Sequence, residues 1–238
     1  MLFRSEEKID KLNDFHIKKN YVKKSLNEII YENLKGKILR GDISSDDRLQ
    51  EDNLTKEYET SRTPIRDALR RLEHENIIEK LHYGGYKVKD LTMKNIEDIF
   101  GIRRVLESYA ASLATLRMTE DDVKKMEAIL RKSQEALVNK DYGAFIELNT
   151  EFHLSLYSAS KSEYLLRILQ NLRDYFYRYR KIILKTKSNL EDSLKNHEMM
   201  IQKMKEGDQD AVEHLVKEHV NRALKVLKKE MNKSGLGL

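Results

Sequence analysis

Apolar residues recur every three or four positions in the first part of the chain, which is the spacing of a helix that buries one face. The first of these stretches covers residues 26–40, and Gly41 ends it. After a loop over residues 42–49, Leu54 and Tyr58 mark a short second helix. The pattern therefore predicts two helices in succession ahead of an arginine-rich segment.

A third helix is predicted over residues 64–75. Thr63 is a candidate N-cap, and the only proline, Pro64, then occupies the first helical position, where its missing N–H and fixed φ cost nothing. Two short strands around a glycine turn follow: residues 77–81, the turn Tyr83-Gly84-Gly85 and residues 86–88. Three helices followed by a small hairpin are typical of a winged helix-turn-helix.

Helical periodicity returns near residue 92 and continues almost to the end of the chain. Six helices are expected, and Thr119 with Asp122 forms a capping box at the start of the second. Their approximate ranges are 92–116, 119 onward, 141–159, 162–184, 189–206 and 208–231. The predicted fold is mostly α, with an N-terminal extension (1–24), a winged helix-turn-helix (25–90) and a C-terminal all-α antiparallel helical bundle (91–238).

Charge and composition narrow the class of protein. The 238 residues include 45 Lys and Arg against 40 Asp and Glu, and this net charge of +5 permits a nucleic-acid partner without requiring one. Basic and acidic residues nearly balance over residues 1–90, so a DNA site must be a local basic patch. Cysteine is absent, which excludes disulfides and thiolate metal ligands. No apolar run reaches the roughly 20 residues of a membrane span and no signal peptide is evident, so a cytoplasmic protein with no membrane partner is expected.

The arginines of the third helix form a candidate DNA-reading surface. Its apolar residues share one face, which directs Arg66 and Arg70 to the opposite side, and Arg62 lies just before the helix between Ser61 and Thr63. Hydroxyls and N–H groups at a helix N-terminus suit phosphates, and guanidinium groups pair with guanine edges. The spacing alone leaves an alternative open, in which the helix is amphipathic and its arginines are only solvated.

Three histidines of the predicted bundle point inward by helical phase. His153, His197 and His219 lie on three different helices among apolar neighbours, whereas His214 lies about 140° around the last helix from His219. Three imidazoles can make a facial metal site with open positions, and Asn149, one turn before His153, could add an oxygen. Three separate core histidines with local hydrogen bonds are the alternative that phase leaves open.

The segment LQEDNLTKEYETSRTPIRDALRRL, residues 49–72, resembles the signature of the GntR family of transcription regulators, and the similarity extends over residues 26–88. The resemblance implies operator contacts from the start of the third helix and from a wing tip over residues 82–85. With the geometric candidate Arg70, the predicted DNA-binding residues are Ser61, Arg62, Thr63, Arg66, Arg70, His82, Gly84 and Gly85. Two positions depart from the family pattern: Ser45-Asp46 replaces its usual Pro-Gly, and Asn76 replaces a glycine but tolerates positive φ.

Four blocks further along resemble the FadR-type C-terminal ligand-binding domain, called FCD, and cover most of residues 92–225. They are IFGIRRVLE (99–107), NTEFHLSLY (149–157), NHEMMIQKMKEGD (196–208) and AVEHLVKEHV (211–220). In metal-binding members an Asp-x-x-x-His pair and two more histidines hold a divalent ion. The resemblance therefore implies a divalent transition metal (Zn, Ni or Mn) on Asn149, His153, His197 and His219. The neutral Asn149 replaces the aspartate of the family and is a weaker ligand.

Many FCD domains bind small organic acids against the metal, so the resemblance implies a small organic-acid effector. Arg103 is a candidate for its carboxylate, because a guanidinium pairs bidentately with that group. An i,i+4 pair of Arg103 with Glu107 is the alternative. Tyr177 and Arg180 share one face of the fourth bundle helix and are further candidates.

Together these features predict a homodimeric, ligand-responsive regulator that binds palindromic double-stranded operator DNA, as a repressor or an activator. One rival is an all-α metalloenzyme with an appended DNA-docking module. Against it, no general base lies beside the histidines, since Glu151 is about 200° around the helix from His153. A nucleoid-type structural DNA-binding protein is the third class, and it would not need an inward histidine triad.

Overall fold

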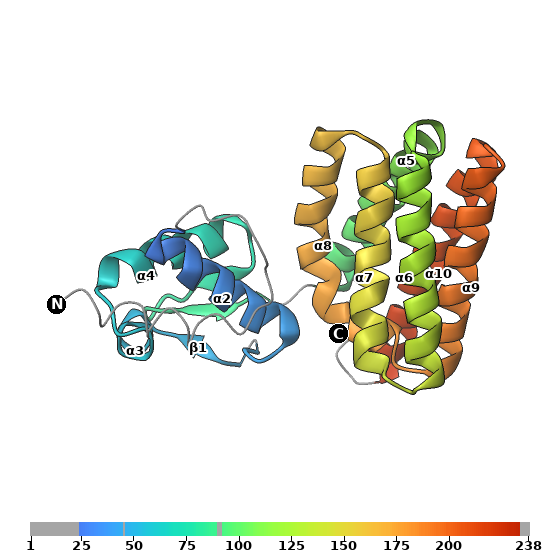
Figure 1. Ribbon diagram of the computed structural model, residues 1–238. Coiled ribbons are helices and arrows are strands. Elements are labelled where there is room, and N and C mark those ends of the chain that lie inside the picture. Colours follow the sequence, from blue (N-terminus) through green and yellow to red (C-terminus); the bar gives the residue numbers. More distant parts are fainter. Residues whose placement is uncertain (1–23, 45, 90–91, 234–238) are drawn as a thin grey trace. The chain divides into compact units, whose positions relative to one another are not determined.

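The structure is a computed structural model that describes residues 24–44, 46–89 and 92–233, so the predicted extension lies outside the described residues except for Lys24. The chain divides into two compact units, residues 1–90 and 91–238. The described part is predominantly helical with one small sheet (Figure 1). None of the helices in the described ranges is both long enough and apolar enough to cross a membrane.

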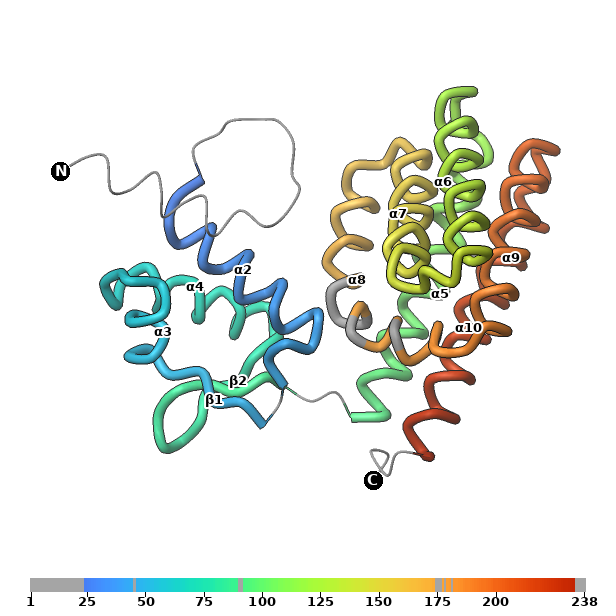
Figure 2. The backbone as a smooth tube through the Cα atoms, turned by 60° about the horizontal axis from the view of Figure 1, so that its bottom comes forward, coloured from blue at the N-terminus to red at the C-terminus, as the bar shows by residue number. Residues whose placement is uncertain are grey.

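The N-terminal unit is a winged helix-turn-helix, as predicted (Figure 2). Its elements are α2 (Leu26–Arg40), β1 (Arg48–Leu49), α3 (Glu51–Glu57), α4 (Arg62–His74), β2 (Ile78–Lys80) and β3 (Tyr86–Val88). Both α2 and α3 pack on α4. Leu34 of α2 and Leu69 of α4 are fully buried at the centre of this small core, so burial on two sides fixes the position of α4 in the unit.

The helix α4 starts two residues earlier than predicted. Its N-cap is Ser61 and its first helical residue is Arg62, so Thr63 is not the cap. Pro64 therefore occupies the third helical position, which is still in the first turn, where backbone N–H groups have no intrahelical partner. Asn76, just beyond the helix, adopts a φ of 54°, as expected for a substitute for glycine.

The three strands form an antiparallel sheet in the order β1-β3-β2. Ile78 pairs with Val88 and Lys80 with Tyr86, which makes the predicted hairpin. The short strand β1 lies within the segment predicted as a loop, because two residues are too few to show an alternating pattern. Gly85 has a φ of +77°, and a Cβ there would lie 2.8 Å from the Leu49 carbonyl oxygen. Only glycine therefore lets the hairpin turn approach β1 this closely.

The C-terminal unit is the predicted all-α bundle (Figure 1). The helices in its described residues are α5 (Met93–Arg117), α6 (Glu120–Val138), α7 (Tyr142–Ala159), α8 (Glu163–Ile183), α9 (Lys187–Lys205) and α10 (Gln209–Lys233). Capping boxes at Thr92 and Thr119 begin α5 and α6. Helix α5 packs along α10 and α6 along α7, around a core that includes Phe100, Phe152 and Tyr157.

Candidate DNA interface and effector pocket

The arginines at the start of α4 lie on the surface of the N-terminal unit. Arg62, Arg66 and Arg70 are exposed, while the apolar residues of the opposite face are buried. Ser61 and Thr63 are exposed at the N-terminus of the helix, and the Ser61 side chain makes no capping hydrogen bond. Hydroxyls, helix N–H groups and guanidinium groups are thus gathered on one accessible helix end, which suits contact with a phosphate backbone and base edges.

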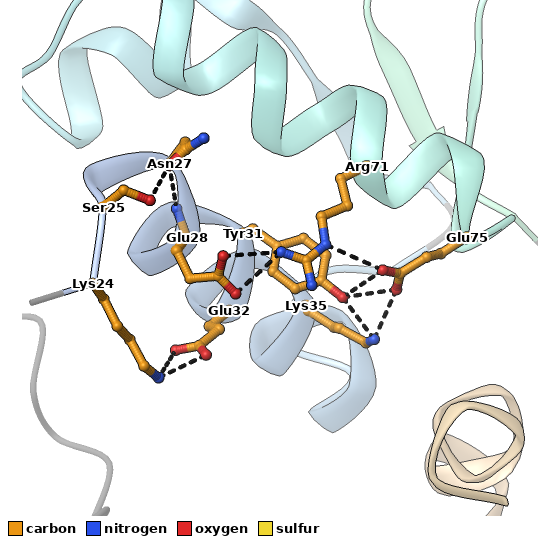
Figure 3. Close-up of polar contacts among 9 residues, drawn as sticks. All are labelled: Lys24, Ser25, Asn27, Glu28, Tyr31, Glu32, Lys35, Arg71 and Glu75. Carbon is orange, nitrogen blue, oxygen red and sulfur yellow. Dashed lines mark hydrogen bonds and ion pairs between the residues drawn. The ribbon is translucent and has the colours of Figure 1, made fainter. Parts of the chain in front are cut away.

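Arg71 also lies on α4, but its side chain contacts α2 and helps to hold the two helices together (Figure 3). The Arg71 guanidinium stacks over the Tyr31 ring at 3.7 Å and pairs with Glu28 at 3.1 Å and with Glu75 at 3.4 Å. The Tyr31 hydroxyl and the Lys35 ammonium each donate to the Glu75 carboxylate at 2.7 Å. These contacts join α2 to the C-terminal half of α4, so Arg71 holds the helix while the earlier arginines remain accessible.

A residue of β1, Arg48, holds the hairpin turn in place. The Arg48 guanidinium donates to the carbonyl oxygens of Tyr83 and Gly84, each at 2.6 Å. His82 and Gly84 are exposed, and Tyr83 is 94 % exposed at the tip. The predicted wing residues therefore lie at an accessible, braced turn. Arg48 was missed by sequence reasoning because its partners are backbone carbonyls about 35 residues away, which leave no motif.

In the C-terminal unit, three buried histidines from three helices meet. The ring centroid of His153 (α7) lies 5.0 Å from that of His197 (α9), and each lies 5.2 Å from that of His219 (α10). One ring nitrogen of each lies within 4.8 Å of the others. The rings therefore share one location and do not occupy three separate environments.

The electrostatics of this cluster suit a metal ion. Burial lowers the pKa of His153 and of His197 well below 6.5, and neighbouring imidazoles and arginines add to the effect. Burial, followed by the charge of Arg222, lowers the pKa of His219 to about 3. Neutral imidazole is the form that binds metal. Moreover, His197 Nε2 is buried with no hydrogen-bond partner among the described residues, a cost that coordination would remove.

Two further residues flank the histidines. Asn149 Nδ2 donates to Ser193 Oγ at 2.9 Å, which leaves the amide oxygen as the atom able to ligate a cation. Glu107 Oε2 lies 3.9 Å from His153 Nδ1. That separation is too long for a hydrogen bond, so the carboxylate acts on the imidazole through its charge. The residues present thus fit a divalent transition metal, although Glu107 was considered from sequence only as a partner of Arg103.

A pocket opens beside the histidine cluster. Its polar lining consists of Arg103, Asn149, His153, Arg180, Asn189, Ser193, His219 and Arg222. Arg103 is buried and donates to Glu107 at 2.6 Å, so the i,i+4 pair and the position in the pocket are both present. Arg180 donates to Thr150, and burial, followed by the charge of Arg103, lowers its pKa to about 10. Among the described residues that line the pocket there are three arginines and no acid, which suits an anionic ligand.

Three placements differ from the sequence-based site. Tyr177 is not among the residues that line the pocket, and its hydroxyl donates to Glu147 of α7 at 2.5 Å, so its role as an effector contact stays a prediction. His197 also lies outside the lining, with its ring stacked on Phe152 at 3.9 Å. Arg222 lines the pocket and was missed, although its i+3 spacing from His219 on α10 would have placed it on the same face.

A winged helix-turn-helix and a helical ligand-binding unit in one chain define a transcription regulator with separate DNA-binding and sensing domains. Two family models match the two units: "Bacterial regulatory proteins, gntR family" over residues 26–88 and "FCD domain" over residues 98–222. The chain belongs to the GntR family and carries an FCD effector-binding domain. It is a transcriptional regulator and not an enzyme, in keeping with its relatives.

Individual relatives agree with this assignment. The gluconate operon transcriptional repressor of Bacillus licheniformis is 30 % identical over 74 % of this chain and 74 % of its own length. An uncharacterised HTH-type transcriptional regulator of Bacillus subtilis, YdhC, is 28 % identical over 83 % of this chain and 89 % of its own length. The solved structure of E. coli McbR/YncC matches with a TM-score of 0.75 and 24 % identity, covering 88 % of this chain and 100 % of that one, and supports the fold alone.

Proposed function

We propose that this regulator represses transcription by binding operator DNA through α4 and the wing. Ser61 and Thr63 would bind phosphates, and Arg62, Arg66 and Arg70 would approach base edges. His82, Gly84 and Gly85 at the wing would lie against the neighbouring backbone or minor groove. The exposure of the five α4 residues and of His82 and Gly84 supports this role, and repression is supported by relatives named as repressors.

The sensing half of the proposal is that the FCD domain holds a divalent transition metal and a small organic acid. The single observation that carries it is the meeting of His153, His197 and His219 beside a pocket with three arginines. Asn149 and the three imidazoles would hold the ion. Bound there, it would supply a fixed positive charge for a carboxylate. Arg103 and Arg180 would orient the same anion from the protein side.

The proposal includes a dimer formed by two copies of this chain. Ile102, Val105, Tyr109 and Leu116 lie on one face of α5, and each is about half exposed or more. Such an apolar stripe on a bundle is a typical self-association surface. A two-fold dimer would present two copies of α4 to the two halves of a palindrome. Operator affinity would then depend on the spacing that the effector-bound bundle allows, provided the effector binds the two arrangements unequally.

The metal site is tested with a matched pair of histidines on α10. His219 is buried in the cluster, whereas His214 on the same helix is exposed. We expect wild-type protein to bind about one Zn, Ni or Mn ion per chain. His219→Ala should weaken binding by more than the roughly 10- to 100-fold expected for losing a residue that only orients a ligand.

The measurement is competition against a chromophoric chelator, together with elemental analysis of the purified protein. His214→Ala should bind like wild type, which controls for loss of an imidazole in general. Wild-type affinity in His219→Ala would remove the metal from the proposed function.

A further inference from the structure

Arg66 of α4 is held by a carboxylate from the helix before it. Glu51 is the first residue of α3, and its two oxygens accept from Nε and Nη2 of Arg66 at 3.3 and 2.9 Å. The Glu51 side chain is only 26 % exposed, against 45 % for Arg66. Most exposed ion pairs hold neither partner in place, but a two-point contact fixes the plane of the guanidinium as well as its distance.

We propose that Glu51 is a positioning residue for DNA reading, which orients the Arg66 guanidinium so that its far edge meets a base pair. This inference rests on the proposed operator contact by Arg66. A guanidinium has five N–H donors, and Glu51 uses the Nε–H and one of those on Nη2. Three donors on Nη1 and Nη2 remain, and bidentate pairing with guanine O6 and N7 needs two. The carboxylate and a base can therefore bind the same guanidinium together.

The hydrogen bond from Arg66 also lowers the pKa of Glu51, so the carboxylate is ionised at neutral pH. A negative charge close to a DNA-binding surface weakens binding to all sequences through repulsion of phosphates. The pair formed by Arg62 and Asp52 differs in kind, because it has one contact at 2.9 Å and both side chains are about two-thirds exposed. We therefore assign a positioning role to Glu51 and not to Asp52.

The experiment measures two quantities separately: discrimination between base pairs and overall affinity for DNA. The probe is the duplex that wild-type protein selects from random-sequence DNA, together with duplexes that carry single base-pair substitutions. Glu51→Gln removes the charge at nearly constant shape. It should bind the selected duplex about five- to tenfold more weakly, a part of the discrimination that one bidentate base contact gives. It should also relax the preference at the base pair where Arg66→Ala relaxes it, and at no other.

Asp67→Asn is the matched control, since Asp67 is exposed on α4 next to Arg66. It removes the same charge and should tighten binding to all duplexes equally. In an Arg66→Ala background, Glu51→Gln should cause no further loss of discrimination. A second readout in the free protein is the Nε–H signal of Arg66 in 15N NMR, which should exchange faster with solvent in Glu51→Gln.

If Glu51→Gln behaves like Asp67→Asn, with tighter binding and unchanged base preference, Glu51 only repels DNA and the inference is overturned. If Arg66→Ala itself leaves every base preference intact, the proposed operator contact fails as well, and the single variants tell these two failures apart.

Discussion

The arginines of α4 have two different roles: some are exposed and available to DNA, and others hold the helix in the fold. Arg62 is 65 % exposed and has one exposed partner, Asp52, so little holds it in the free protein. Arg71 is stacked and paired on three sides and belongs to the fold. Composition alone cannot separate the two, because both are arginines within one short cluster.

Arg62→Ala should weaken operator binding by about 1–3 kcal/mol if the contact is to a base edge. The fold should be retained, because an exposed side chain with one surface ion pair contributes little to stability. Fluorescence anisotropy with the selected operator measures the first effect, and thermal unfolding followed by circular dichroism checks the second. A folded variant with full operator affinity would remove Arg62 from the interface.

Pairs of helices are held by contacts that the sequence pattern does not reveal. Periodicity predicted that α2 and α4 would each bury one face. It did not predict that the Glu75 carboxylate would bind Tyr31, Lys35 and Arg71 together (Figure 3). Burial raises the pKa of Glu75, yet the hydrogen bonds from Lys35 and Tyr31 and the charges of Lys35 and Arg71 outweigh burial. The pKa of Glu75 therefore lies below its ordinary value of 4.5.

Acid should consequently weaken the attachment of α2 to α4. A carboxyl whose pKa is lower in the folded state stabilises the fold above its unfolded pKa, and this contribution is lost as pH falls through the folded pKa. Glu75→Gln should thus be less stable than wild type near neutral pH, and the difference should shrink below about pH 4.5. Urea unfolding followed by circular dichroism measures this, since the chain has no tryptophan for fluorescence. A difference that stays constant through the acid range would exclude Glu75 as the source.

Helix α5 carries the proposed dimer surface. Val105→Glu would place an unpaired charge in that surface, so the variant should sediment as a monomer where wild type sediments as a dimer. Val138→Glu at the end of α6 is the control, because Val138 is even more exposed (75 %) but lies outside the stripe. If the Val105→Glu variant is still a dimer, the two copies must associate through a surface other than this face of α5.

For the whole molecule, the fold class and the order of the helices and the hairpin were predictable, because long helices leave a clear period and Gly41, Thr119 and the glycine turn mark boundaries. Helical phase also placed His153, His197 and His219 on inward faces. Helical phase tells which way a side chain points but not which residues lie next to it. For that reason Tyr177, which bonds to Glu147, was predicted as an effector contact, and Arg222, which lines the pocket, was not. The strand β1 escaped notice because it is only two residues long.

Paired titrations of acid and operator test the proposed passage of a signal from an acid bound in the FCD domain to α4. The ligand is the small carboxylate, from a screened panel, that most raises the unfolding temperature of the metal-loaded protein. Its affinity is then measured without and with saturating operator.

By linkage, operator must change acid affinity by the same factor by which acid changes operator affinity, and the expected coupling is about 1–3 kcal/mol. His197→Ala should lose this coupling while Arg62 and Arg66 still bind operator. Equal acid affinity with and without operator in the wild type would exclude this coupling, because the bundle would then bind its ligand without regulating DNA binding.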